Sequence, residues 1–159
     1  FHRDYRNFVK QGSGNNMYKR LIVGVAFLVS LMTWMTLGMA GEKAVLYKSP
    51  WCGCCTGYAK FLKESGFQVT EKKIEDMDRI KDDLGIADDL RSCHTTVIDG
   101  YVFEGHVTLD KVRQVLDERP PIRGIALPGM PTGVPGMPGP TPEKLEYFTI
   151  EENPKPYLK

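Results

Sequence analysis

Four cysteines offer most of the chemistry in this sequence. Three of them crowd into Cys52-Gly53-Cys54-Cys55, and the fourth lies in the pair Cys93-His94. Thiolates can exchange disulfides, and they bind soft metals such as copper(I), zinc and iron–sulfur clusters. The sequence therefore predicts a redox or metal-binding site built from both segments.

Cys52 and Cys55 are spaced for the first turn of a helix, where Cys52 would cap the helix and Cys55 would lie on the same face. Free N–H groups and the positive end of the helix dipole stabilise thiolates there, so both residues are redox candidates and candidate ligands. Thioredoxins carry Trp-Cys-Gly-Pro-Cys at such a helix start, and here Cys54 replaces the proline. A third thiol would compete for mixed disulfides, whereas adjacent sulfurs can bridge several copper(I) ions. Trp51 is expected to shield this site as an aromatic lid.

Imidazole and thioether groups extend the candidate ligand set. Cys93 and His94 stand just before a predicted strand, where thioredoxins place a cis-proline beside their cysteines. His106 follows the same hairpin and is either a further ligand or an exposed turn histidine. Met130 and Met137 are weaker candidates, because in their repeated Pro-Gly-Met-Pro contexts they could equally be apolar contacts of a loop.

Two plainer explanations of the cysteines stay open. Four cysteines in an exported protein can form two structural disulfides, although such frameworks spread their cysteines along the chain. A closed zinc site built from three of the cysteines and His94 would be structural and redox-silent.

The N-terminal part of the chain is predicted to direct export. Residues 17–20 include two basic side chains, residues 21–37 are uncharged and largely apolar, and Gly38-Met39-Ala40 places small residues where a signal peptidase cleaves. We expect residues 17–40 to be a signal peptide, with a retained membrane anchor as the alternative, and residues 1–16 to be a disordered upstream extension. Either way the domain would face an oxidising compartment.

Charge excludes one class of partner. Five of the 21 basic residues and one of the 20 acidic residues precede Gly41, which leaves 16 basic and 19 acidic residues and a formal charge of −3. Nucleic acid is therefore not an expected partner. Membrane contact is expected only through an uncleaved signal.

Residues 41–119 are predicted to form an α/β domain with the element order βαβαββα. Short apolar runs indicate strands at 44–47, 67–69, 95–98 and 101–103, and helical spacing indicates helices from the cysteines to 65, at 77–84 and from 108 to 119. Asp99-Gly100 predicts a two-residue hairpin turn, and Thr108 is expected to cap the last helix. This order predicts a thioredoxin-like fold, in which helices flank a mixed sheet and the site lies where the first strand meets the first helix.

Residues 120–159 are predicted to be a loop and tail that pack on the domain. The stretch 120–142 is rich in proline and glycine, so it is expected to form neither helix nor central sheet. Residues 147–150 are expected to add an edge strand.

The motifs together resemble the CopG-type copper-resistance proteins, a periplasmic family of predicted metal-binding proteins. The resemblance covers roughly residues 43–140 and rests on motifs in the same order, at 47–55, 92–95, 99–102, 104–107, 127–131 and 135–137. It implies a thioredoxin-like fold, export to the periplasm of a Gram-negative bacterium and a role in copper homeostasis. It also implies that Cys52, Cys54, Cys55, Cys93 and His94 hold more than one copper ion, and that the bound copper can change its oxidation state.

Three hypotheses about the function follow, and each belongs to a different class of protein. The first is a periplasmic copper-binding protein that holds copper(I) in a multi-cysteine cluster, exchanges it with a copper-handling or redox partner protein, and could act as a copper(I)/copper(II) oxidoreductase. The second is a thiol–disulfide oxidoreductase acting through Cys52 and Cys55, which the missing cis-proline disfavours. A structural zinc domain is the third.

Overall fold

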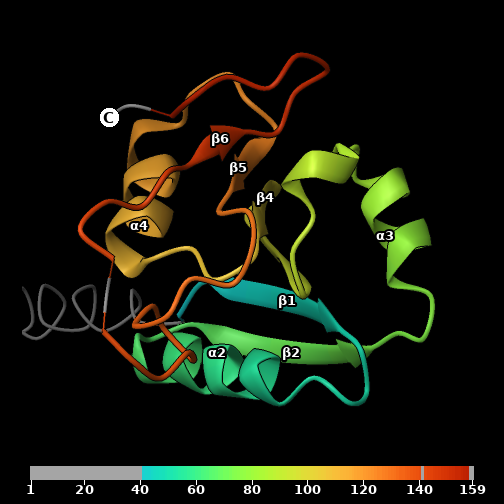
Figure 1. The fold of residues 1–159 in the computed structure, drawn as a ribbon, viewed down its shortest axis with the longest axis vertical. Coiled ribbons are helices and arrows are strands. Elements are labelled where there is room, and N and C mark those ends of the chain that lie inside the picture. The colour runs from blue at the N-terminus through green and yellow to red at the C-terminus, as the bar shows by residue number, and fades with distance from the viewer. Residues whose placement is uncertain (1–40, 141, 158–159) are drawn as a thin grey trace, which may run out of the picture. The chain divides into compact units, whose positions relative to one another are not determined.

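The pairing of the first strand with the third organises the sheet. The computed structural model describes residues 41–140 and 142–157, so the predicted signal peptide and upstream extension lie outside the described residues. Strand β1 (Lys43–Lys48) is parallel to β2 (Gln68–Lys73) and antiparallel to β3 (His94–Ile98). The sheet order is β2-β1-β3-β4-β5-β6 (Figure 1), with the last three strands at Tyr101–Glu104, Gly124–Ala126 and Phe148–Thr149.

Helices cover both faces of this sheet. Helices α2 (Gly53–Glu64) and α4 (Leu109–Glu118) share one hydrophobic core with Phe103 of β4, whereas the segment after α3 (Met77–Asp83) contributes to a second core with Val102. Val102 and Phe103 are neighbours in a strand, so their side chains point to opposite faces. The result is the predicted thioredoxin-like mixed α/β fold.

The structure confirms most of the elements that local sequence signals predict. Asp99 and Gly100 both have positive φ, at 47° and 84°, as a tight hairpin turn requires. The prediction that Thr108 caps α4 through its side chain is wrong in detail. Thr108 does occupy the N-cap position, but its hydroxyl bonds the Tyr147 hydroxyl at 2.8 Å instead of a helix N–H.

The prediction that residues 120–142 form no central sheet is wrong for β5. Residues 122–127 contain no proline, and Ile125 and Ala126 are fully buried between β4 and β6. A Cβ added at Gly124 would lie 1.8 Å from the Val102 carbonyl oxygen, so glycine permits this close strand pairing. The predicted edge strand in residues 147–150 is confirmed as β6.

The second Pro-Gly-Met-Pro repeat lies against the first turns of α2, and the orange segment that contains it passes across this helix in the view of Figure 1. Gly136 has φ of +82°, and a Cβ there would lie 2.6 Å from the Tyr58 amide nitrogen and 3.0 Å from the Cys54 carbonyl oxygen. Gly57 presents no side chain on the facing side, where its Cβ would lie 3.2 Å from the Gly136 Cα. The backbone of the repeat therefore rests directly on the backbone of the cysteine helix.

No helix among the described residues is long and apolar enough to cross a bilayer.

Gly136→Ala is expected to destabilise the fold more than Gly129→Ala, the equivalent change in the first repeat. Both glycines have positive φ, but a Cβ at Gly129 meets nothing within 4 Å. Gly129→Ala should therefore cost only the left-handed backbone penalty, about 1–2 kcal/mol, and Gly136→Ala should cost at least roughly twice that because the helix backbone blocks its Cβ. Urea unfolding of both variants measures the difference, and equal costs would contradict the docking of the repeat on α2.

Candidate metal centre

The first turn of α2 presents three sulfur atoms. Cys52 is the N-cap residue, and its Sγ accepts a hydrogen bond from the Cys55 amide at 3.3 Å. No acidic side chain lies in this first turn, so the positive end of the helix dipole acts on the sulfur atoms. Lys48 ties the end of β1 to the same turn, because its buried ammonium donates to the Thr56 hydroxyl at 2.6 Å.

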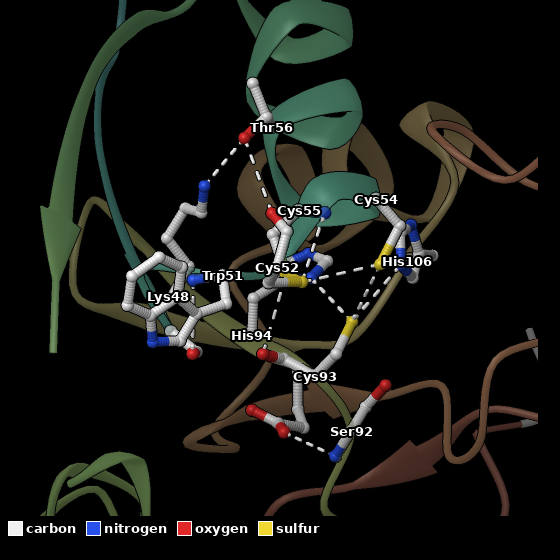
Figure 2. Close-up of a disulfide and its surroundings, with 12 residues drawn as sticks. Lys48, Trp51, Cys52, Cys54, Cys55, Thr56, Ser92, Cys93, His94 and His106 are labelled. Atoms are coloured by element: carbon white, nitrogen blue, oxygen red, sulfur yellow. Dashed lines mark hydrogen bonds between the residues drawn. A yellow bond between two sulfur atoms is a disulfide. The ribbon is translucent and has the colours of Figure 1, made fainter. Parts of the chain in front are cut away.

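Cys52 and Cys55 form a disulfide in this structure, and their Cα atoms are 5.4 Å apart (Figure 2). The bond joins residues only three positions apart. Such a short loop restricts the unfolded chain little, so the bond is a weak structural staple. Cys54 and Cys93 are free thiols, and the alternative of two structural disulfides is therefore not what the structure contains.

Cys93 lies at the meeting point of the sulfur atoms and the imidazoles. Its Sγ is 3.8 Å from the Cys54 Sγ, 3.2 Å from His94 Nδ1 and 3.3 Å from His106 Nε2. Cys54 Sγ is in turn 3.4 Å from Cys52 Sγ. The structure thus brings together the two cysteine segments and both histidines of the domain.

Both imidazoles are fully buried, so of the two alternatives for His106 the exposed turn histidine is wrong. His106 Nδ1 donates to the Pro135 carbonyl oxygen at 2.7 Å, which leaves Nε2 without a proton and facing Cys93. The ring of Tyr58 packs against the two imidazoles, with centroid distances of 4.6 Å to His94 and 5.5 Å to His106. Among the described residues His94 Nε2 has no hydrogen-bond partner.

Burial sets the protonation of these groups. Desolvation lowers the pKa of His94 well below its usual value, with a further contribution from His106, and desolvation also lowers the pKa of His106. Burial, together with the neighbouring Cys54, raises the pKa of Cys93 to about 12. At neutral pH the metal-free site therefore holds two neutral imidazoles and a protonated Cys93, and a metal ion bound by Cys93 must displace that proton.

Two residues that sequence reasoning missed lie under this site. The Lys81 ammonium and the Glu104 carboxylate form a buried ion pair, with side chains 4% and 0% exposed. Lys81 lies four residues after Met77, so the helical spacing of the predicted helix already placed it on the apolar stripe. Glu104 is the cross-strand partner of Thr95. The signal that could have revealed this ion pair is that two charged residues, Lys81 and Glu104, occupy positions that face the core.

The weaker candidates, Met130 and Met137, differ in their burial. Met130 is 58% exposed, and Met137 is partly buried against the main hydrophobic core, as the loop-contact alternative predicted. The prediction that Trp51 covers the site is wrong, because its side chain is 93% exposed and its ring points away from the sulfur atoms (Figure 2).

The remaining side chains form two candidate ligand groups that share one sulfur. The first group contains the four cysteines, and the second contains Cys93, His94 and His106; within each group the ligand atoms lie within 4.8 Å of one another. Sulfur and imidazole donors suit soft and borderline metals rather than calcium or magnesium. The donor set therefore fits copper or zinc.

Comparison with solved structures decides the family. One structure, described as "Copper resistance protein copG- Form 1", is 36% identical; the match covers 69% of this chain and 87% of that chain, with a TM-score of 0.63. A second, described as "Copper resistance protein copG- Form 2", is 34% identical over 73% of this chain and 94% of that chain, with a TM-score of 0.66. The chain belongs to the CopG family of copper resistance proteins.

The CopG family assignment agrees with a second comparison. A model for a protein family of unknown function, DUF411, matches residues 90–137, which contain Cys93, both histidines of the site, the first Pro-Gly-Met-Pro repeat and all but the last residue of the second. No curated protein matches the chain. Membership of this family and the cysteine cluster together support a copper-related role for the chain.

Cys93 is expected to be alkylated slowly in the folded, metal-free protein. Its raised pKa, about 12, leaves little thiolate at pH 7.5, so iodoacetamide should react roughly tenfold or more slowly with it than in urea-unfolded protein. The rate should rise continuously as the pH is raised toward 10. Peptide mass mapping after timed alkylation measures both effects, and equal rates in folded and unfolded protein would show that Cys93 is not desolvated.

Proposed function

We propose that this protein binds copper(I) through Cys52, Cys54, Cys55 and Cys93 as its part in copper resistance, with His94 and His106 completing the site. The convergence of four sulfur atoms from two distant segments carries this proposal. Thiolates are the donors that select copper(I). The relatives described as copper resistance proteins support copper as the physiological metal.

The number of donors favours more than one copper ion over a single zinc ion. A closed structural zinc site uses four protein ligands, whereas the two ligand groups here comprise Cys52, Cys54, Cys55, Cys93, His94 and His106. Because the groups share Cys93, one thiolate would bridge metals bound in both. Adjacent thiolates that bridge are suited to a multinuclear copper(I) cluster.

Copper binding and the Cys52–Cys55 disulfide compete for the same sulfur atoms. Reduction of this bond takes two electrons and yields the two thiolates that the four-cysteine group needs. We further propose that bound copper would cycle between copper(I) and copper(II), with a redox partner protein accepting the one electron that each copper(I) releases and returning it on reduction. Sulfur donors favour the reduced ion and imidazoles also suit the oxidised ion.

The proposed place of action is the periplasm. The support is the predicted signal peptide at residues 17–40, together with the use of a disulfide, which persists in oxidising compartments. A copper-handling or redox protein of the same compartment would deliver or accept the metal.

Thiol–disulfide exchange is the second candidate function, and the disulfide at the start of α2 favours it. Two features oppose it. The free Cys54 Sγ lies 3.4 Å from Cys52 Sγ, where it would intercept mixed disulfides. In addition, Cys93 and His94 occupy the cis-proline position of thioredoxins, and the described residues contain no cis peptide bond.

Metal counting on Cys54→Ser separates the two functions. Reduced protein offered copper(I) and zinc(II) together, without oxygen, is expected to retain more than one copper per chain and little zinc. Cys54→Ser should lose at least one copper because it removes the sulfur between Cys52 and Cys93, while the Cys52–Cys55 pair stays intact. Unchanged copper content together with full disulfide-exchange activity would favour the oxidoreductase.

Copper capacity is also expected to depend on the disulfide. Protein purified with the Cys52–Cys55 bond should bind fewer copper(I) ions than the same protein after reduction, because two of the four sulfur donors are unavailable. Elemental analysis after desalting gives both values. A Cys52→Ser, Cys55→Ser variant should show the lower value with or without reductant, and a full complement in this variant would remove these two sulfurs from the ligand set.

A further inference from the structure

A buried ion pair lies beneath the candidate metal centre and outside its ligand set. Lys81 extends from α3 and Glu104 ends β4, and neither side chain is more than 4% exposed. Removing two charges from water is costly, and a well-packed apolar pair would often stabilise a fold as well or better. Its contacts therefore indicate what the pair does.

The hydrogen bonds of this pair go to the segment that carries Cys93 and His94. Glu104 Oε1 accepts from the Ser92 amide at 2.6 Å, and Oε2 accepts from the Thr95 hydroxyl at 2.5 Å. Lys81 Nζ donates to the Ser92 carbonyl oxygen at 2.9 Å. Ser92 and Thr95 directly precede and follow the two ligand residues, so the pair holds both ends of this four-residue segment.

The same contacts also fix the segment that carries His106. Glu104 lies two residues before His106, and the intervening Gly105 amide donates to the His94 carbonyl oxygen at 2.9 Å. Gly105 has φ of +78°, and a Cβ there would lie 2.9 Å from the Ser92 Cβ. The segment that carries Cys93 and His94 is thus packed and hydrogen-bonded against the segment that carries His106, next to the Lys81–Glu104 ion pair.

We propose that Lys81 and Glu104 are positioning residues, which hold Cys93 Sγ in register with Cys54 and with both imidazoles before any metal binds. This inference rests on the proposed copper function. Ligands held in place lose little conformational freedom on binding, so the pair would increase copper affinity without touching copper. Because Cys93 belongs to both candidate ligand groups, holding it in place would increase the copper affinity of both groups.

The test uses a variant that removes both charges, Lys81→Met with Glu104→Gln. Loss of one partner alone would leave a buried charge and could unfold the protein, whereas the double variant buries none. The matched control is Lys63→Met with Glu71→Gln, an ion pair of 2.8 Å that joins α2 to β2 at the surface. Circular dichroism and thermal unfolding establish that each protein is folded.

The first readout is copper(I) affinity, from competition with a chromogenic copper(I) chelator. The double variant should bind copper(I) about 10- to 100-fold more weakly, the usual effect of losing groups that orient metal ligands. The control should stay within about twofold of the parent protein, as expected for a surface pair. A folded double variant with unchanged affinity and unchanged cross-linking, the second readout, would overturn the proposal.

The second readout needs no metal. In protein with the Cys52–Cys55 bond intact, Cys54 and Cys93 are the two thiols, 3.8 Å apart. Diamide, which takes up two electrons and two protons, joins them into a disulfide that peptide mapping detects. The double variant should form this bond at least about tenfold more slowly, because its Cys93 is no longer held in place.

The two readouts separate the inference from the function on which it rests. If the parent protein binds no copper and cross-linking still slows in the double variant, the positioning role stands and the copper proposal fails. If the double variant does not fold, Thr95→Val decides, because it keeps the ion pair and removes one of its bonds to the segment. Slower cross-linking in Thr95→Val supports positioning, and unchanged cross-linking and copper affinity overturn it.

Discussion

The candidate centre depends on the register between β1 and β3. Lys48, the last residue of β1, pairs with His94, the first residue of β3. The chain that leaves β1 and the chain that enters β3 must therefore lie next to each other, at the same end of these two strands. Cys52 follows Lys48 by one tight turn, and Cys93 directly precedes His94. A shift of this register by one residue would exchange the faces of β3 and separate the sulfur atoms.

The sequence predicted this convergence because the signals involved are local or come from a known motif order. The hairpin at Asp99-Gly100, the helix start at Cys52 and the Cys93-His94 pair each follow from a few neighbouring residues. Strand β5 escapes prediction because proline and glycine dominate the composition of residues 120–142, although the stretch around Ile125 contains no proline. Its burial depends on contacts with β4 and β6 that no local pattern encodes.

The parts of the site that were missed are long-range and polar. No residue near Lys81 in the sequence indicates that Glu104 is its partner. A buried ion pair also has no sequence periodicity by which it could be predicted. The tautomer of His106 is set by a carbonyl at Pro135, which only the folded chain brings within 2.7 Å. The place of Trp51 beside Cys52 predicts a covering role, but the orientation of a side chain on an exposed turn depends on packing, and Trp51 is 93% exposed.

The docking of the second Pro-Gly-Met-Pro repeat has a consequence for the order in which the site is completed. Every thiol and imidazole of the candidate centre lies between Cys52 and His106, yet Pro135 supplies the acceptor for His106 and Gly136 rests against α2. A chain that emerges from its N-terminus carries the whole set of donors well before it carries the segment that arranges them. During synthesis the donor residues are therefore present before the centre can be arranged. A fragment that ends before Pro135 would contain all the donors but would lack the segment that orients them.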